Sequence, residues 1–511
     1  MKKSRPQCGK APAAVCAAFA ATVCAMLAGC NVGPKYVPPT TTAPPAYKES
    51  PAQFKDAGEW TVAKPQDAAL RGNWWEIYNE PDLNALEEQL NINNQNIREA
   101  FENFMEARAL VREARSQYFP TLSVGPSYTR SQTSSNLGSG AIASSQSGTQ
   151  SQVFSLPGEV SWEPDLWDKV RNTVRSAQYT AQVSAADLAN ERLTEQASLA
   201  EYFFEIRGQD ALQKILDNAV NADKKSLDAE QGRYDTGVDD QISLVQAQTA
   251  LATAQSAAIN NKIARAQFEH AIAMLIGKPA SEFSIPVVAK TTAPPPIPIG
   301  LPSQLLERRP DVAAAERNMA SANAQIGVAY AAYYPSLTIS GSGGVESSAI
   351  GKLLEAASRF WSVGPVLSET VYDGGLRRAT VNQYIATYNA NLAAYRQSVV
   401  TAFQQVEDSL SEVRILSEQL QRQQEAVSRS QTYLNLEQTR YDTGIDPYID
   451  LADAQITLFG NQQGLANLQI QQMTASVELI QALGGGWDKS QLPTPAQITA
   501  KPSHAETTIQ H

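Results

Sequence analysis

The chain has 511 residues, which is too long for one small core and favours a large or repeated architecture. Its 52 acidic and 41 basic residues give a formal net charge of −11, and this balance argues against nucleic acid as a partner. Only three histidines occur, and no Ser/His/Asp arrangement, metal-ligand cluster or phosphate-binding loop stands out. The sequence therefore predicts neither an enzyme nor a metal or cofactor site.

The first thirty residues have the pattern of an export signal. Basic residues precede an apolar run from Ala11 to Leu27, which is short and rich in small residues, so residues 1–29 are predicted to be a cleaved signal peptide. The run ends in Leu-Ala-Gly-Cys, which is similar to the bacterial lipobox and predicts a covalent lipid on the sulfur of Cys30. Ordinary signal cleavage beside an incidental cysteine is the alternative. The remaining cysteines all lie inside the signal: Cys8, Cys16 and Cys24.

Beyond the signal, composition and repeats divide the chain into five parts. The segment after Cys30 is rich in Pro, Thr and Ala and is predicted to be an extended tether. The C-terminal segment is polar after Gln491 and is predicted to be disordered. In order, the parts are the tether at 30–81, a first repeat at 82–278, a Pro-rich connector at 279–303, a second repeat at 304–484 and the C-terminal tail at 485–511.

Short motifs recur in the same order in the two repeats. One agreement could arise by chance, whereas three in order indicate an internal duplication. The matching segments are Tyr118-Phe-Pro-Thr-Leu122 with Tyr333-Tyr-Pro-Ser-Leu337, Asp168 and Arg171 with Asp373 and Arg377, and Arg233-Tyr-Asp-Thr-Gly237 with Arg440-Tyr-Asp-Thr-Gly444.

Each repeat contains one very long helical stretch. No proline occurs between Pro164 and Pro279, and neither Gly nor Pro occurs from Leu376 to Thr443. A helix over the second stretch would be about 100 Å long, which suits coiled-coil packing and not a globular core. Shorter helices, each about half as long, flank the long ones, so two of them end to end would match one long helix. The short helices are predicted at 83–117, 242–276, 303–332 and 448–483.

Four strands are predicted between the helices, at 121–130, 153–162, 336–345 and 359–371. Their apolar residues alternate with small polar ones, which is the pattern of outer-membrane strands, and the Ser/Gly-rich segment at 131–152 fits an external loop. A half-buried strand in a soluble sheet has the same alternation. Because four strands cannot close a barrel, three copies would have to share one. The predicted fold is an α+β membrane channel with a trimeric 12-stranded transmembrane β-barrel and a long antiparallel coiled-coil α-barrel.

The chain resembles the TolC/OprM-type outer-membrane efflux family, in its lipoprotein branch. The resemblance implies a homotrimer in the outer membrane that extends into the periplasm, joined through a periplasmic adaptor (membrane fusion) protein to an inner-membrane RND-type pump. It would be a passive exit duct for drugs or small toxic compounds. A duct for type I protein secretion and a structural coiled-coil lipoprotein are the alternatives. The segments that carry the resemblance are Cys30-Asn-Val-Gly-Pro-Lys-Tyr-Val-Pro38, Trp74-Trp75 with Leu83, Leu306-Glu-Arg-Arg-Pro-Asp-Val312, Ala322-Asn-Ala-Gln-Ile-Gly327, Tyr334-Pro335, Asp373-Gly374-Gly375 and Arg440-Tyr-Asp-Thr-Gly444.

The resemblance also implies a gate at the periplasmic tip. Gly237 and Gly444 match the turns where helices reverse and the adaptor docks, although both also suit ordinary helix C-caps. Asp450 and Asp453 are three residues apart and share a helix face. They match acids that ring the narrowest point in three subunits, against the simpler interpretation of a solvated face. Tyr441 and Arg440 match the gate segment. Some relatives carry a basic residue where this chain has Asp446, which puts a gate salt bridge at that position in doubt.

Overall fold

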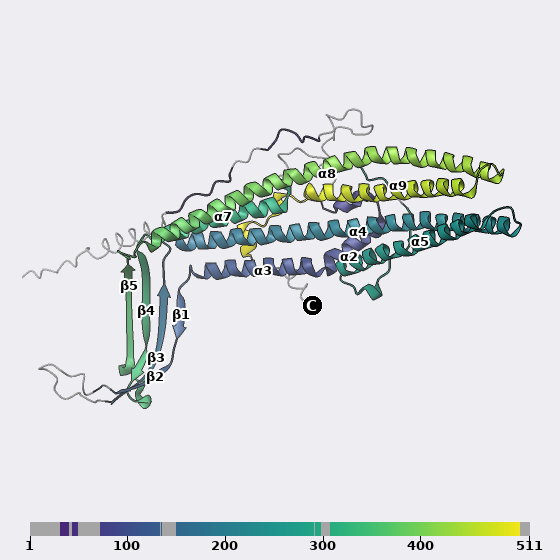
Figure 1. The fold of residues 1–511 in the computed structure, drawn as a ribbon. Coiled ribbons are helices and arrows are strands. Elements are labelled where there is room, and N and C mark those ends of the chain that lie inside the picture. Colours follow the sequence, from purple (N-terminus) through teal and green to yellow (C-terminus); the bar gives the residue numbers. More distant parts are fainter. Residues whose placement is uncertain are drawn as a thin grey trace, which may run out of the picture.

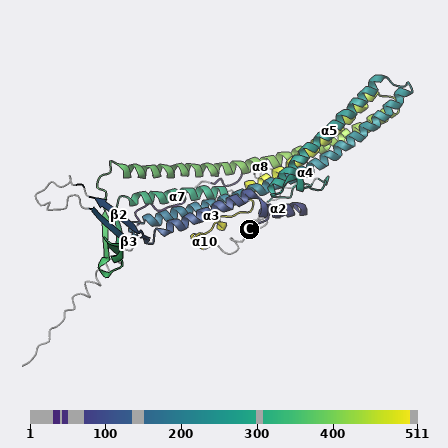
Figure 2. The same ribbon diagram turned by 90° about the horizontal axis from the view of Figure 1, so that it is seen from below.

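The computed structural model describes residues 31–39, 43–49, 72–132, 134, 150–290, 292–297 and 307–500. The predicted signal peptide, Cys30, most of the loop at 131–152 and the tail beyond residue 500 lie outside these residues. Figure 1 and Figure 2 show a β-sheet standing at one end of a long layer of helices, and two helical hairpins at the opposite end. No helix in the described ranges combines the length and the apolar character needed to cross a bilayer.

The sheet is antiparallel, in the order β1-β3-β4-β5, with β2 also pairing with β3. Because β1 and β2 pair with successive parts of β3, they form one column, and the four predicted columns are confirmed. The prediction of a continuous first strand is wrong: it stops at Gly125 and Pro126, where proline offers no N–H to the ladder. The strands are β1 Thr121–Val124, β2 Ser127–Gln132, β3 Gln150–Trp162, β4 Ser336–Ser347 and β5 Arg359–Ser368.

The two faces of the sheet differ in chemistry. Residues directly opposite each other point to the same side, so the register of Ile339 with Trp162 and with Pro365 places apolar groups together. This apolar face is bare in the single chain, where Trp361 remains 80% exposed. The apolar face carries Leu122, Val160, Trp162, Ile339, Val345, Trp361, Val363 and Leu367, and the other face carries Ser123, Ser155, Ser340, Ser342 and Ser362.

The two long helices are confirmed. Helices α4 (Lys169–Asp235) and α8 (Leu376–Asp442) have 67 residues each. Each begins beside an aspartate that pairs with an arginine of the first turn. An oxygen of Asp168 lies 2.8 Å from the Arg171 guanidinium, and one of Asp373 lies 2.7 Å from that of Arg377. The duplicated aspartates and arginines therefore mark equivalent helix starts.

The short helices follow the prediction with two corrections. The helix predicted at 303–332 begins at Pro310, because Arg309 before it is extended, as residues that precede proline prefer. The segment predicted as a single helix at 83–117 is broken at Asn94, whose backbone is extended. Its side chain accepts a hydrogen bond from the Ile97 N–H and donates to Glu195 and to the Leu275 carbonyl. A buried asparagine that caps one helix and binds two others stabilises the break. The helices are α2 Pro81–Asn93, α3 Gln95–Ser116, α5 Gln241–Leu275, α7 Pro310–Ala331 and α9 Tyr448–Ala482.

The helices form a single wall. Near the sheet, α4 packs between α3 and α7, and α7 also packs against α8. Toward the far end, α4 contacts α5 and α9, and α9 packs against α8. Two short helices therefore lie end to end along a long one, as their lengths predict, and Figure 1 shows α7 followed by α9 beside α8.

The largest core lies halfway along this wall. Trp74 and Trp75, in a 3-10 helix at Trp74–Tyr78, pack with Phe203 of α4 and with Met473 and Val477 of α9. Each large side chain buried there contributes roughly 1.5–3 kcal/mol. The tether was predicted to be extended up to residue 81, and this helix corrects that prediction. Its tryptophans join the two repeats at their middle.

The C-terminal tail is ordered further than predicted. After Gln491 the chain forms the short helix α10 (Pro495–Thr499), which begins with a capping box at Thr494. Ile498 is fully buried against Val111 and its neighbours, and the Arg108 guanidinium donates to the carbonyls of Ile498 and Ala500 at 3.3 and 3.1 Å. The expectation of disorder after Gln491 is therefore wrong up to residue 500, because an apolar anchor and an arginine hold this segment on α3.

Glu87 in α2 generates a stability prediction. Its side chain is fully buried, and neither carboxylate oxygen has a hydrogen-bond partner among the described residues, so burial raises its pKa well above the usual range. A folded-state pKa above the unfolded value means that stability is lost as pH rises. We expect Glu87→Gln to raise the apparent melting temperature at pH 8 and to have little effect near pH 4. The free-energy gain is about 1.4 kcal/mol for every tenfold increase that burial produces in the proton affinity of the carboxylate.

Thermal unfolding of the purified protein in detergent, across this pH range, measures the effect. The matched control is Glu88→Gln, because Glu88 is the exposed neighbour on the same helix. A melting difference that does not change with pH, or the same difference in both variants, would contradict the assignment of a buried protonated acid.

Candidate gate at the helical tip

Both hairpins turn through the same glycine-centred cap. Gly237 and Gly444 have φ angles of 71° and 72°, in the left-handed region that glycine enters without strain. The N–H of Val238 donates to the Arg233 carbonyl, and that of Ile445 donates to the Arg440 carbonyl, each at 2.9 Å. These bonds close the C-terminal ends of α4 and α8. The duplicated motif is thus a helix cap, and the docking role of its glycines stays a prediction.

Tyr441 joins the ends of the two long helices. Its side chain is only 6% exposed, and its hydroxyl donates to the carboxylate of the fully buried Glu230 on α4. The Arg233 guanidinium lies 4.9 Å from the centre of the Tyr441 ring, at cation–π distance. Burial and then Glu230 raise the pKa of Tyr441, so its hydroxyl keeps its proton. The tip of one repeat is therefore held to the tip of the other.

The counterpart of Tyr441 in the first repeat does not take part. Tyr234 is 41% exposed, although it occupies the same place in its motif. The sequence predicted Tyr441 for this site and missed Glu230. A signal was available, because Glu230-Gln-Gly-Arg-Tyr234 matches Glu437-Gln-Thr-Arg-Tyr441 and extends the duplicated motif toward the N-terminus.

Arg440 pairs within its own hairpin. Its guanidinium makes two contacts with the Asp446 carboxylate, one of them at 2.8 Å from Nη2 to Oδ1. This hydrogen bonding lowers the pKa of Asp446, while loss of solvent and then Asp446 raise the pKa of Glu437. In the first repeat Arg233 lies 3.5 Å from Asp239, at the same spacing along the chain. Asp446 is thus engaged in an ion pair within one subunit.

Asp450 and Asp453 lie together near the start of α9, and both are exposed. No ion pair involves either carboxylate in the described part of the chain. The Tyr433 phenol faces them from α8. Its pKa is raised by burial, then by Glu437, and then by Asp453 and Asp450. Their first-repeat counterparts are Ser243 and Gln246, so the acidic face belongs to the second repeat alone.

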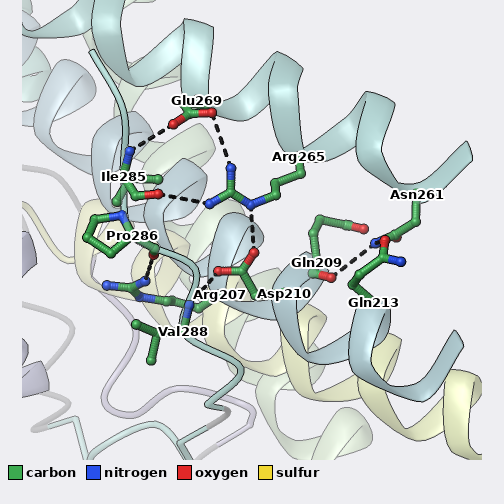
Figure 3. A network of polar contacts seen from close by, with 10 residues as sticks. All are labelled: Arg207, Gln209, Asp210, Gln213, Asn261, Arg265, Glu269, Ile285, Pro286 and Val288. Atoms are coloured by element: carbon green, nitrogen blue, oxygen red, sulfur yellow. Dashed lines mark hydrogen bonds and ion pairs between the residues drawn. The ribbon is translucent and has the colours of Figure 1, made fainter. Parts of the chain in front are cut away.

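A second polar network fixes the base of the first hairpin (Figure 3). Asp210 of α4 binds the Arg265 guanidinium of α5 at 2.6 Å and accepts from the Val288 N–H at 2.8 Å. Arg265 and Glu269 also bind the carbonyl and the N–H of Ile285. The connector is therefore held against the α4/α5 hairpin. The corresponding positions of the second hairpin hold Ser417 and Gln472, which cannot form this ion pair.

Long paired helices, a sheet with a bare apolar face and two hairpin ends joined by polar contacts define the class of protein: a subunit of an outer-membrane export channel. The chain belongs to the outer membrane efflux protein family, whose family model matches residues 86–278 and 301–485. The predicted resemblance, the fold class, the function as an outer-membrane efflux duct and the location in the outer membrane are confirmed. As a member of this family, it is the outer-membrane component of a pump complex.

Relatives match over almost their whole length. The solvent efflux pump outer membrane protein SrpC of Pseudomonas putida is 30% identical over 476 residues, which is 91% of this chain and 97% of that protein. The probable efflux pump outer membrane protein TtgC of P. putida KT2440 is 29% identical over 465 residues, covering 90% and 94%. The solved outer-membrane channel OprN is 28% identical with a TM-score of 0.79, covering 90% of this chain and 100% of that one. The Campylobacter jejuni CmeC channel shares the fold, with 20% identity, a TM-score of 0.81 and coverage of 94% and 99%.

The Tyr441 contact leads to a prediction for the closed state. Tyr441→Phe removes the hydroxyl and leaves the buried Glu230 carboxylate without its donor, at a cost of about 1–3 kcal/mol. We expect the variant to open more often in planar bilayers than the unaltered channel. Tyr234→Phe is the matched control, since it makes the same change in the exposed counterpart. Equal single-channel behaviour of the two variants would show that the Tyr441 contact does not hold the tip closed.

Proposed function

We propose that three copies of this chain form the exit duct of a tripartite pump. An inner-membrane RND-type pump would expel drugs or small toxic compounds, and a periplasmic adaptor would join it to the helical tip. The carrying observation is the amphipathic sheet, whose apolar face and outer columns are uncovered in one subunit. In lipid, unpaired backbone groups cost several kcal/mol each, which favours a closed 12-stranded β-barrel made by three copies. The work of such a duct is passive, and we expect no catalytic step.

The names of relatives guide the choice of transported compounds. Similar proteins are described as outer-membrane components of solvent, toluene and antibiotic efflux pumps. We therefore favour small organic compounds over secreted polypeptides as the cargo. Co-capture of an ATP-driven transporter with a secreted polypeptide would favour type I secretion. A purely structural coiled-coil lipoprotein would leave the sheet without a role.

At the tip, we propose that Asp450 and Asp453 of three subunits form an acidic ring at the narrowest point of the duct. The exposure of both carboxylates on one face of α9 supports this assignment. A ring of carboxylates concentrates cations, and its carboxylates repel one another when they come close together. Arg440 and Asp446 would hold the neighbouring turn in shape, and Gly237 and Gly444 would present the turns to the adaptor.

The acidic ring has a direct electrical test. We expect the double variant Asp450→Ala with Asp453→Ala to weaken block by hexamminecobalt(III) by roughly tenfold, which corresponds to about 1.4 kcal/mol. Single-channel conductance with the blocker on the tip side measures this. The control is Asp235→Ala with Asp442→Ala, which removes two exposed tip aspartates at equivalent places in the repeats. Unchanged block in the first variant would reject the ring.

We also propose that Cys30 carries the lipid that anchors the chain. The segment just after it is held on the helical wall close to the sheet. A Cβ atom on Gly33 would lie 2.5 Å from the Gly327 Cα, so only glycine allows this crossing. The Tyr36 hydroxyl donates to the Glu316 carboxylate at 2.5 Å. Three residues reach at most about 11 Å. A lipid on Cys30 would therefore enter the membrane near the junction of α7 and β4.

Metabolic labelling tests this anchor. We expect an alkynyl palmitate analogue to label the unaltered chain and the Cys24→Ser variant, and to leave Cys30→Ser unlabelled. Cys24 is the matched control because it lies inside the predicted signal. Labelling that persists in Cys30→Ser would place the lipid elsewhere, and absence of label from all three proteins would reject lipidation.

A further inference from the structure

A cavity of about 550 Å³ opens in the helical wall halfway between the sheet and the tip. It lies between α4 and α8, where α9 ends and α7 begins. Its volume falls within the range of small-molecule sites. Leu193, Pro310 and Ala482 give it apolar surface, and the remaining lining is polar or charged. The proposed gate and the Asp210 network lie on other parts of the chain.

The charge in this cavity is strongly negative. Glu201 of α4, Glu412 of α8 and Glu478 of α9 line it, and none of them forms an ion pair within the described ranges. Asp408 of α8 also lines it, and among those residues its carboxylate accepts a hydrogen bond only from the Gln404 side chain. Carboxylates that share a site without a counter-ion repel one another, which favours a bound cation.

Arg309 is the one arginine among the described lining residues, and it already has partners. Arg309 binds the Asp311 carboxylate through two nitrogens, at 2.9 and 2.6 Å, and donates to the Ala482 carbonyl at 3.1 Å. Its charge therefore compensates Asp311 and leaves the four other carboxylates uncompensated. Burial, followed by Glu478 and Glu205, raises the pKa of Glu201 to about 7, and burial followed by Glu412 raises the pKa of Glu478.

Ser409 supplies an independent sign of a ligand. Its side chain lies on the cavity lining with only 8% of the residue exposed, and its hydroxyl has no hydrogen-bond partner in the part of the chain that the structure describes. The oxygen itself is not enclosed by protein atoms, so it opens onto the cavity, where a bound molecule would supply the partner that such hydroxyls normally have. A polar group this deeply placed in the wall of an acidic cavity therefore has a position open for a bound molecule.

The size and the lining of the cavity indicate the chemical class of the molecule that would bind there. Among the described residues, no group of three or more His, Cys, Asp or Glu side chains converges as metal ligands. The carboxylates come from three helices and surround a volume much larger than one ion, next to apolar side chains. Separated charges beside apolar surface suit a molecule that carries its positive charge on an apolar frame.

We propose that this cavity is a binding site for an organic cation, with Glu201 and Glu478 as its counter-charges and Ser409 as a hydrogen-bonding group. The assignment of the ligand as an exported compound rests on the proposed duct function, whereas the binding itself rests on the cavity alone. The cation competes with the proton of Glu201. Binding therefore strengthens from pH 6 to pH 8, as Glu201 loses that proton beside Glu205, Glu412 and Glu478, while Arg309 stays paired with Asp311.

Fluorescence anisotropy of ethidium, a planar organic cation, tests the site on the purified full-length channel in detergent. We expect saturable binding at pH 8 that weakens by roughly tenfold in the double variant Glu201→Gln with Glu478→Gln. The matched control is Glu102→Gln with Glu106→Gln, which removes two exposed carboxylates of α3. Ser409→Ala, a small change inside the cavity, weakens binding without altering net charge.

Three results would overturn the site: no saturable binding by the unaltered channel, equal loss in the charge-matched control, or no loss in both cavity variants. A drug-susceptibility assay in cells lacking their own channel separates this outcome from the duct function. Restored resistance without ethidium binding rejects the cavity and keeps the duct. Binding without restored resistance keeps the cavity and rejects the duct.

Discussion

The structure depends on a sheet that cannot be complete in one copy. Four strand columns run side by side, and the outermost ones, β1 with β2 and β5, have a neighbour on one side only in the described chain. One face carries tryptophan, leucine and valine in the open, while the other carries serine. An apolar face suits lipid, and lipid does not tolerate unpaired strand edges. Closure by further copies satisfies both requirements, and it sets the number and spacing of the helices that continue from the strands.

The helices continue the strand columns as a long wall of even thickness. Each 67-residue helix is matched by shorter helices placed end to end, so the wall keeps its thickness from the sheet to the tip. Polar side chains lie at the joints between short helices. Asn94 joins α2 to α3, and the acidic cavity opens at the joint of α7 and α9.

The two repeats share a fold and differ in what holds them. The first hairpin is fixed to the connector by Asp210 and Arg265, and the second has serine and glutamine at those positions. At the tip it is the second repeat that supplies the engaged side chain, because Tyr441 is buried whereas Tyr234 of the first repeat is exposed. The two similar hairpins therefore differ in their polar contacts: the first is bound to the connector, and the second supplies the tyrosine that joins the two hairpin ends.

Periodicity and repeated motifs predicted most of the architecture from sequence. Long stretches free of proline marked α4 and α8, and alternation marked the strand columns, because both signals extend over many residues. Single residues decided what was missed. Asn94 breaks a helix by capping the next one, and Thr494 starts α10 with a capping box that was readable but stood in a polar tail.

The candidate sites were likewise predictable where a sequence motif marks them and not where packing alone forms them. Tyr441 and Arg440 were predicted through a motif. Glu230 was missed although the duplicated motif extends to it, because the sequence alone does not pair Glu230 with Tyr441 of the other repeat. The acidic cavity was not predictable, since Glu201, Glu412 and Glu478 are far apart in sequence and no local pattern connects them. Tertiary packing alone brings these carboxylates together.

Disulfide trapping between neighbouring copies tests the shared barrel most directly. Ser123→Cys in β1 would be combined in turn with a cysteine at each position of β5, and oxidised in the outer membrane. A barrel closed by three copies predicts a covalently linked trimer for at least one register, and none when Ser123→Cys is combined with Ser340→Cys in the inner strand β4. Folded protein that forms no such link at any position of β5 would contradict a barrel closed by three copies.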